Sequence, residues 1–332
     1  MKDKPEELLS FCSKIDFGTI RLSDAEKVFC SEWNNEIIAL CKSLPESTQI
    51  DALHFFMKYS GLSFGQELNF FRTYYIPTWS IIYWLIQSGP NGNGLRQIDI
   101  KNAKTAHSMA MFLHALDDHL KDSEMPVTHL ALLLRSQAWM IMNNAFNNLA
   151  NGVDGGEQIV RNFIDDYYSS IRTSKEIESM DSYCDLFRKQ MATGFITPIL
   201  LTKKMISNKE FTNAIEIAYG SFGIAWRLLD DIKDIKTDMM KGVDSSVYIC
   251  LPEEIKNYWK NKDVGEKIDK NSGRDKVILD YILENSVIDG ISERICIELE
   301  LAASIVDRYN ITGLADEFRC MLKPLKNRQG HI

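Results

Sequence analysis

Hydrophobic residues recur at spacings of three and four along most of the chain, as in the group Ile37, Leu40, Cys41 and Leu44. This spacing places apolar side chains on one face of an α-helix. Runs in which β-branched and polar residues alternate, which would indicate strands, are nearly absent. The pattern therefore predicts an all-α fold, a single large helical bundle that forms one domain over residues 1–332.

Two predicted helices, Ala106–Leu120 and Ala214–Ile235, are apolar almost all round, which is typical of helices at the centre of a bundle. Each ends in a cluster of carboxylates. Residues three and four apart lie on adjoining parts of a helix surface, so the acids of each cluster point the same way. The clusters are Asp117, Asp118 and Asp122 on the first helix, and Asp230, Asp231 and Asp234 on the second.

Like charges at this spacing repel one another, and a bound divalent cation would remove the repulsion. Mg²⁺ prefers oxygen ligands and is commonly shared between carboxylates and substrate phosphates. Two clusters that end separate core helices indicate facing walls of one metal-lined mouth above a deep apolar interior. That arrangement suits a ligand with a diphosphate head and a hydrocarbon tail. The alternative is a pair of solvated helix ends, with Lys233 and Lys236 balancing the second cluster.

Composition narrows the possible partners. The 332 residues include 38 Lys plus Arg and 46 Asp plus Glu, a formal net charge of −8. This balance argues against nucleic acid as a partner, because phosphate binding normally needs a basic excess. Seven scattered cysteines without a CxxC pair predict reduced thiols in a cytoplasmic protein. No apolar run reaches the roughly 20 residues that a membrane span needs.

Three segments resemble those of the trans-prenyl diphosphate synthases and of the wider class I isoprenoid synthase fold. They are HALDDHLKDSEMPVTH (residues 114–129), RKQMATG (188–194) and GIAWRLLDDIKD (223–234). The first and third are similar to the two aspartate-rich motifs, and the second to the lysine-bearing helix that touches the diphosphate. The resemblance extends from about residue 60 onward and is less clear over 1–60. It implies a helical bundle with a central cavity.

The resemblance also implies the site and its ligands. The substrate would be a prenyl diphosphate, held through Mg²⁺, with three ions per site once diphosphate is bound, and the enzyme would be a homodimer. Lys189 would contact the diphosphate, with Arg188 as a rival. The implied metal ligands are Asp117, Asp118, Asp122, Asp230, Asp231 and Asp234, of which Asp117, Asp118, Asp230 and Asp231 would be catalytic.

Further candidates for substrate binding come from single positions. Arg227 stands where the family has a glutamine, and Arg308-Tyr309 resembles the Arg-Tyr pair with which many bacterial terpene synthases bind diphosphate. Pro77, within the aromatic stretch 74–84, predicts a kinked helix beside the cavity. Aromatic faces stabilise cations, although the same residues also suit an ordinary core. The aromatic candidates are Phe112, Trp79 and Trp226.

The sequence departs from the family where basic residues are expected. The pair of arginines and the glycine that follow the first motif are missing, because residues 123–126 run straight through to Pro126. The N-terminal Gly-Lys-x-x-Arg-Pro segment is not recognisable, and Arg72 is the one basic residue near its expected place. Chain elongation needs two diphosphates held at once, and arginine suits that task.

Three functions remain open on these observations. The leading hypothesis is a terpene synthase that ionises an allylic prenyl diphosphate and resolves the cation by cyclisation or elimination. The second is head-to-tail elongation with isopentenyl diphosphate, by means of non-standard basic residues. The third is a non-catalytic subunit that modulates a prenyl synthase partner.

Overall fold

The computed structural model describes residues 4–63, 65–88, 95–121, 124–172, 177–206, 208–260 and 273–326. These residues form helices joined by loops and contain no strand, which confirms the all-α prediction. The helices are α1 (Lys4–Cys12), α2 (Asp24–Lys42), α3 (Glu46–Tyr59), α4 (Pro77–Ser88), α5 (Gln97–Lys121), α6 (His129–Ala150), α7 (Gly156–Arg172), α8 (Met180–Gln190), α9 (Ala192–Met205), α10 (Lys209–Lys233), α11 (Ile235–Lys241), α12 (Ser246–Ile249), α13 (Glu253–Lys260), α14 (Arg274–Glu284), α15 (Val287–Arg308) and α16 (Thr312–Lys326).

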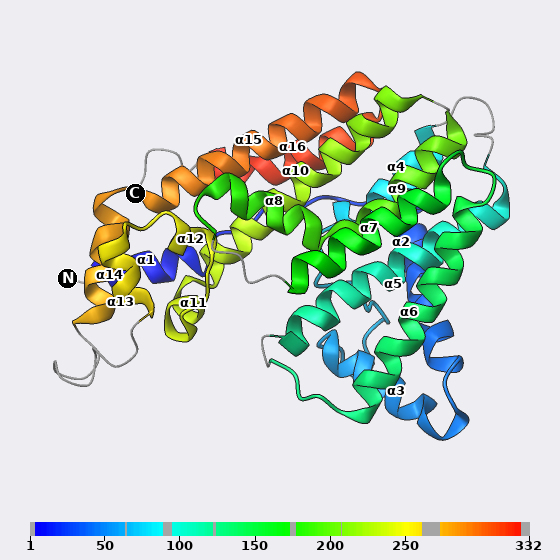
Figure 1. The fold of residues 1–332 in the computed structure, drawn as a ribbon, viewed down its shortest axis with the longest axis horizontal. Coiled ribbons are helices and arrows are strands. Elements are labelled where there is room, and N and C mark those ends of the chain that lie inside the picture. The colour runs from blue at the N-terminus through cyan, green and yellow to red at the C-terminus, as the bar shows by residue number, and fades with distance from the viewer. Residues whose placement is uncertain are drawn as a thin grey trace.

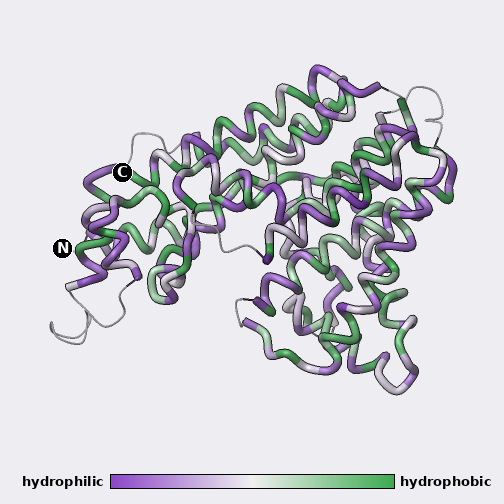
Figure 2. Tube along the Cα trace, viewed as in Figure 1, coloured by the Kyte–Doolittle hydropathy of each residue, from purple (hydrophilic) through white to green (hydrophobic). Residues whose placement is uncertain are grey.

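The long helices pack side by side (Figure 1). α10 lies along α15, which also contacts α16, while α5 pairs with α6. α9 contacts both α5 and α10 and so lies between these two halves of the bundle. The short helices α1, α11, α13 and α14 gather at one end of the molecule. Most helices alternate between hydrophobic and hydrophilic residues, as expected where one face is buried (Figure 2).

α5 and α10 occupy the core, as their composition predicts. Every residue from 106 to 113 in α5 and from 218 to 225 in α10 is buried, so these stretches are covered on all sides. Both helices carry their aspartate clusters at their carboxyl ends, where burial is no longer complete. Asp118 and Asp234 are exposed there, whereas Asp231 stays buried.

Local signals set several helix ends. Ser23 and Glu26 form a capping box at the start of α2, and Asn208 accepts backbone N–H groups at the start of α10. Pro77 is the first residue of α4, so the predicted kink is wrong: proline suits the first turn, whose N–H groups have no helical partner. In the described part of the chain, no helix is long and apolar enough to cross a membrane. All seven cysteines are free thiols, as predicted.

Candidate active site

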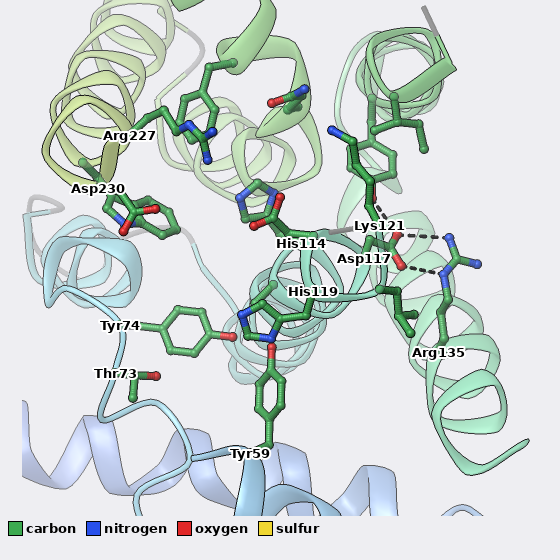
Figure 3. Close-up of a pocket in the computed structure, with 18 of the residues that line it drawn as sticks. Tyr59, Thr73, Tyr74, His114, Asp117, His119, Lys121, Arg135, Arg227 and Asp230 are labelled. Carbon is green, nitrogen blue, oxygen red and sulfur yellow. Dashed lines mark hydrogen bonds and ion pairs between the residues drawn. The ribbon is translucent and has the colours of Figure 1, made fainter. Parts of the chain in front are cut away.

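A cavity of about 790 Å³ opens between the carboxyl ends of α5 and α10 (Figure 3). Residues of α6, α7 and α8, together with Tyr59 at the end of α3 and residues 73–75, complete its wall. The lining residues are Tyr59, Thr73, Tyr74, Tyr75, His114, Ala115, Asp117, Asp118, His119, Leu120, Lys121, Val127, Leu132, Arg135, Tyr167, Ile171, Phe187, Gln190, Trp226, Arg227, Asp230 and Lys233. The fold thus brings one aspartate motif to each side of a single cavity.

Asp117, on the α5 side, is already fully hydrogen-bonded. Its Oδ1 accepts from Nε of Arg135 at 2.5 Å, and its Oδ2 accepts from Nη2 of Arg135 at 3.0 Å. The Tyr167 hydroxyl donates to the same Oδ2 at 2.6 Å. Arg135 comes from α6 and Tyr167 from α7, so Asp117 joins three helices at the edge of the cavity.

Asp231, on the α10 side, has a similar environment and is 2% exposed. Its Oδ1 lies 3.1 Å from Nε of Arg227, one turn earlier on the same helix. Its Oδ2 accepts from the Tyr183 hydroxyl at 2.7 Å and from the backbone N–H of Ser246 at 2.8 Å. The carboxylate therefore also anchors the first turn of α12, and it does not line the cavity.

Asp118 and Asp230, the neighbours of these two anchored acids, line the cavity, and their side chains make no hydrogen bond or ion pair within the described residues. Burial, together with the nearby carboxylates Asp234, Asp231 and Asp118, raises the pKa of Asp230 to about 6, although Arg227 opposes the shift. Burial also raises the pKa of Asp234. Arg227 and Lys233 offset only part of these shifts, so the crowded carboxylates are a favourable environment for a metal ion.

Asp238 is an acid that the sequence analysis missed. It follows Asp234 by one helical turn in α11, and burial with the nearby Asp231, Asp234 and Asp230 raises its pKa to about 7. The spacing of four from Asp230 to Asp234 and again to Asp238 was the signal available in the sequence. The acidic side of α10 thus continues into α11.

The donor set fits hard cations. Mg²⁺ needs only one or two carboxylates from the protein, because water and substrate phosphate supply its other ligands. Asp118 on one wall and Asp230 with Asp234 on the other meet that requirement. Asp122 lies outside the described residues, and among those described no three His, Cys, Asp or Glu side chains converge closely enough to hold an ion by themselves. Ligand oxygens would have to complete any site that spans the two walls.

Basic residues line the same cavity and outnumber its acids. Lys121, Arg135, Arg227 and Lys233 face three aspartates in the lining, so the local balance is positive on a chain whose net charge is −8. Figure 3 shows Arg227 and Asp230 on one wall, with Lys121, Asp117 and Arg135 across the cavity. These four side chains are the cationic groups that an anionic ligand in the cavity would meet. The sequence did not predict Arg135 as a site residue, because the two residues are 18 positions apart and no local pattern links Arg135 to Asp117.

Aromatic rings form another part of the cavity wall. The Trp226 ring lies 5.9 Å from His114 and 6.4 Å from Phe187, measured between ring centroids. Burial lowers the pKa of His114, which keeps this imidazole neutral, and nearby Asp118 only partly opposes the shift. A neutral, largely aromatic surface next to a charged rim suits a ligand that is polar at one end.

Several predicted substrate-binding residues lie elsewhere. Trp79 and Phe112 are packed in the core, the latter against Phe56. Arg188 pairs with Asp185, and Lys189 is exposed. Neither lines the cavity, because the face of α8 that does so carries Phe187 and Gln190.

The Arg308-Tyr309 pair lies still farther away. The Tyr309 ring packs 5.0 Å from Phe211 at the start of α10. At about 1.5 Å per residue, Phe211 is about 28 Å along the helix from Asp230. The pair therefore lies near the opposite end of α10 and does not reach the cavity.

The chain has the all-α fold of the trans-prenyl diphosphate synthases. A geranylgeranyl pyrophosphate synthase from Corynebacterium glutamicum superposes with a TM-score of 0.61 at 12% identity, covering 98% of this chain and 99% of that chain. A geranylgeranyl pyrophosphate synthetase from the archaeon Geoglobus acetivorans superposes with a TM-score of 0.59 at 13% identity, covering 96% of this chain and 99% of that chain. A decaprenyl diphosphate synthase from Rhodobacter capsulatus superposes with a TM-score of 0.58 at 13% identity, covering 89% of this chain and 97% of that chain.

Sequence comparisons do not assign the chain to a family. No family model matches it, and no curated protein matches it either. An identity of 12–13% carries the fold alone, so the activity has to be argued from the site.

Proposed function

We propose that the protein is a Mg²⁺-dependent enzyme that ionises an allylic prenyl diphosphate in this cavity. The observation that carries the proposal is the placement of Asp118 and Asp230, two carboxylates without a hydrogen-bonded or ion-paired partner in the described structure, on facing walls of one cavity. Asp118, Asp230 and Asp234 would hold the ions. Bound Mg²⁺ would neutralise the charge that develops on the departing diphosphate oxygens.

The chain's own groups serve the rest of the reaction. Arg227 and Lys233 lie beside Asp230 and favour an anionic head at the rim. Breaking the bond between the allylic carbon and the diphosphate oxygen leaves a cation on the hydrocarbon. Trp226 and Phe187 present aromatic faces to it and make that part of the wall apolar.

We rank condensation with isopentenyl diphosphate ahead of cyclisation, which reverses the order favoured by the sequence. In condensation, the alkene of isopentenyl diphosphate attacks the allylic cation, a carbon–carbon bond forms, and a proton leaves. The fold neighbours are prenyl diphosphate synthases by name, which supports this order. So do Lys121 and Arg135, because they place positive charge on the wall across from Arg227.

Incubation of the purified protein with Mg²⁺ and geranyl, farnesyl or geranylgeranyl diphosphate, with and without isopentenyl diphosphate, tests the proposal. We expect longer diphosphates that form only when isopentenyl diphosphate is present. Hydrocarbon or alcohol from the allylic substrate alone would establish cyclisation or elimination instead. No turnover under any condition would refute catalysis and favour the non-catalytic subunit.

A matched pair of variants links turnover to the cavity. Asp230→Asn removes a proposed metal ligand, whereas Asp165→Asn alters an exposed aspartate of α7 that lies outside the cavity. Only the first should stop turnover. The expected homodimer and cytoplasmic location stay predictions, which sedimentation and cell fractionation would check.

A further inference from the structure

The two aspartate motifs share an arrangement that their sequences do not reveal. In each, one aspartate binds an arginine through its Nε and accepts a hydrogen bond from a tyrosine. The first set comprises Asp117, Arg135 and Tyr167, and the second comprises Asp231, Arg227 and Tyr183. The adjacent aspartate in each motif is left without such a partner. The same division thus occurs independently on two walls of one cavity.

The anchored aspartates are poorly placed to bind metal. Both oxygens of Asp117 accept hydrogen bonds, and so does Oδ2 of Asp231, whose Oδ1 is paired with a guanidinium. A metal ion at either carboxylate would have to share an oxygen atom with these donors or displace one of them. At Asp231, the oxygen that accepts the hydrogen bond from the Tyr183 hydroxyl also accepts one from the backbone of Ser246.

The arginines, in contrast, retain donors for a ligand. Nε of Arg227 donates to the Tyr183 hydroxyl at 2.8 Å, and within the described residues neither Nη makes a hydrogen bond. Its side chain is 26% exposed, and in Figure 3 the guanidinium reaches toward the cavity between Asp230 and His114. Arg135 uses Nε and Nη2 on Asp117, which leaves Nη1. Guanidinium N–H groups match the geometry of phosphate oxygens.

We propose that the motifs divide their work: Asp117 and Asp231 are positioning residues that hold Arg135 and Arg227 for the diphosphate, while Asp118 and Asp230 face the metals. The proposal rests on the proposed function for the identity of the ligand. It assigns the cavity an affinity for diphosphate that needs no metal. It also explains how the chain compensates for the arginines that are missing after the first motif, because α6 and α10 supply guanidinium groups instead.

Calorimetric titration of the full-length protein with inorganic diphosphate tests the division, first in EDTA and then with Mg²⁺. In EDTA we expect the wild type to bind, and Arg227→Gln and Asp231→Asn each to weaken binding about ten-fold or more, since each removes or misplaces a charge-assisted contact. Asp230→Asn, which removes a negative charge from the lining, should not weaken binding in EDTA. It should instead lose the gain in affinity that Mg²⁺ gives the wild type.

A double variant separates positioning from general loss of structure. If Asp231 acts through Arg227, the variant that combines Asp231→Asn with Arg227→Gln binds diphosphate in EDTA no more weakly than Arg227→Gln alone. If Asp231→Asn fails to fold, Tyr183→Phe removes two hydrogen bonds from the same set, one to Asp231 and one from Arg227, and should weaken binding in the same direction. Exposed Asp165→Asn is the control, with unchanged binding expected in both buffers.

The proposal is overturned if the wild type does not bind diphosphate in EDTA. It is equally overturned if Asp231→Asn keeps metal-free affinity but loses the Mg²⁺-dependent gain, because Asp231 would then be a metal ligand. Since these titrations need no turnover, they judge the division of work even if the enzymatic assays fail.

Discussion

Glu317 of α16 provides a quantitative test of the interior, because it is a buried carboxyl group with which no cation of the described residues forms an ion pair. Its Oε2 accepts from the Ser80 hydroxyl at 2.5 Å and its Oε1 from the Trp84 indole N–H at 2.7 Å. Burial raises the pKa of Glu317 from 4.5 to about 8, assisted by the charge of Glu26 and opposed by the two hydrogen bonds. At neutral pH the folded chain therefore keeps a proton that the unfolded chain releases.

This difference in proton binding makes stability fall as pH rises. Below pH 4.5 Glu317 is protonated in both states and contributes no pH dependence. Between 4.5 and about 8 the unfolded state binds fewer protons, so its free energy drops by about 1.4 kcal/mol per pH unit relative to the folded state. Glu317→Gln cannot ionise. It should therefore be more stable than wild type by about 1 kcal/mol at pH 5 and by about 3 kcal/mol at pH 7.

Urea unfolding of both proteins at these two pH values measures the difference. Glu298→Gln is the matched control: Glu298 is also buried, but its Oε1 pairs with Arg294 Nε at 2.8 Å. Removing its charge takes away the more buried of the two carboxylates that pair with Arg294, the other being Asp181, so that variant should be less stable than wild type at pH 7. A stability gain for Glu317→Gln that is equal at pH 5 and pH 7 would show that Glu317 is ionised in the fold, and would refute the reasoning.

Three further predictions concern the site and the packing. Asp230→Asn should reduce Mg²⁺-dependent turnover about 100-fold or more in steady-state assays, because a metal ligand that stabilises the leaving group is lost; wild-type rates would remove Asp230 from the metal site. Trp226→Ala should lower kcat/KM about ten-fold for the allylic substrate through loss of an aromatic face near the cation, and unchanged kcat/KM would place the cation elsewhere. Gly313→Ala should destabilise the fold by about 1–3 kcal/mol in urea unfolding, because the new Cβ would lie 2.1 Å from Cη2 of Trp84. Gly290→Ala, where no atom lies within 4 Å of the new Cβ, should instead be stabilising, and equal effects at the two glycines would contradict the packing argument.

The sequence predicted the fold class and its two central helices because those features are local. Helical periodicity repeats every few residues, and the apolar stretches within α5 and α10 are long enough to require burial on all sides. Residue spacing also identifies the acidic ends of the same helices. Asp118 and Asp230 are therefore predicted as site residues by the sequence alone, and both line the cavity.

Residues that were predicted from a two-residue match, or from aromatic character alone, mostly lie outside the cavity. Arg308-Tyr309 and Trp79 have the residue types of a binding site, but types do not say at which end of a helix a side chain lies. Pro77 was interpreted as a kink because sequence cannot distinguish the first turn of a helix from its interior when the preceding residues are also apolar.

By itself the sequence determined that this chain forms a helical bundle and that two acidic clusters lie at helix ends, because hydrophobic periodicity and residue spacing act within a few turns. Only the tertiary structure decided which partners each aspartate has. Tyr167 is 50 residues from Asp117, and Tyr183 is 48 residues from Asp231, yet both meet their partners at hydrogen-bond distance. Such pairings follow from how whole helices pack, and they separate neighbouring acids of identical chemistry into one that anchors an arginine and one that faces the cavity.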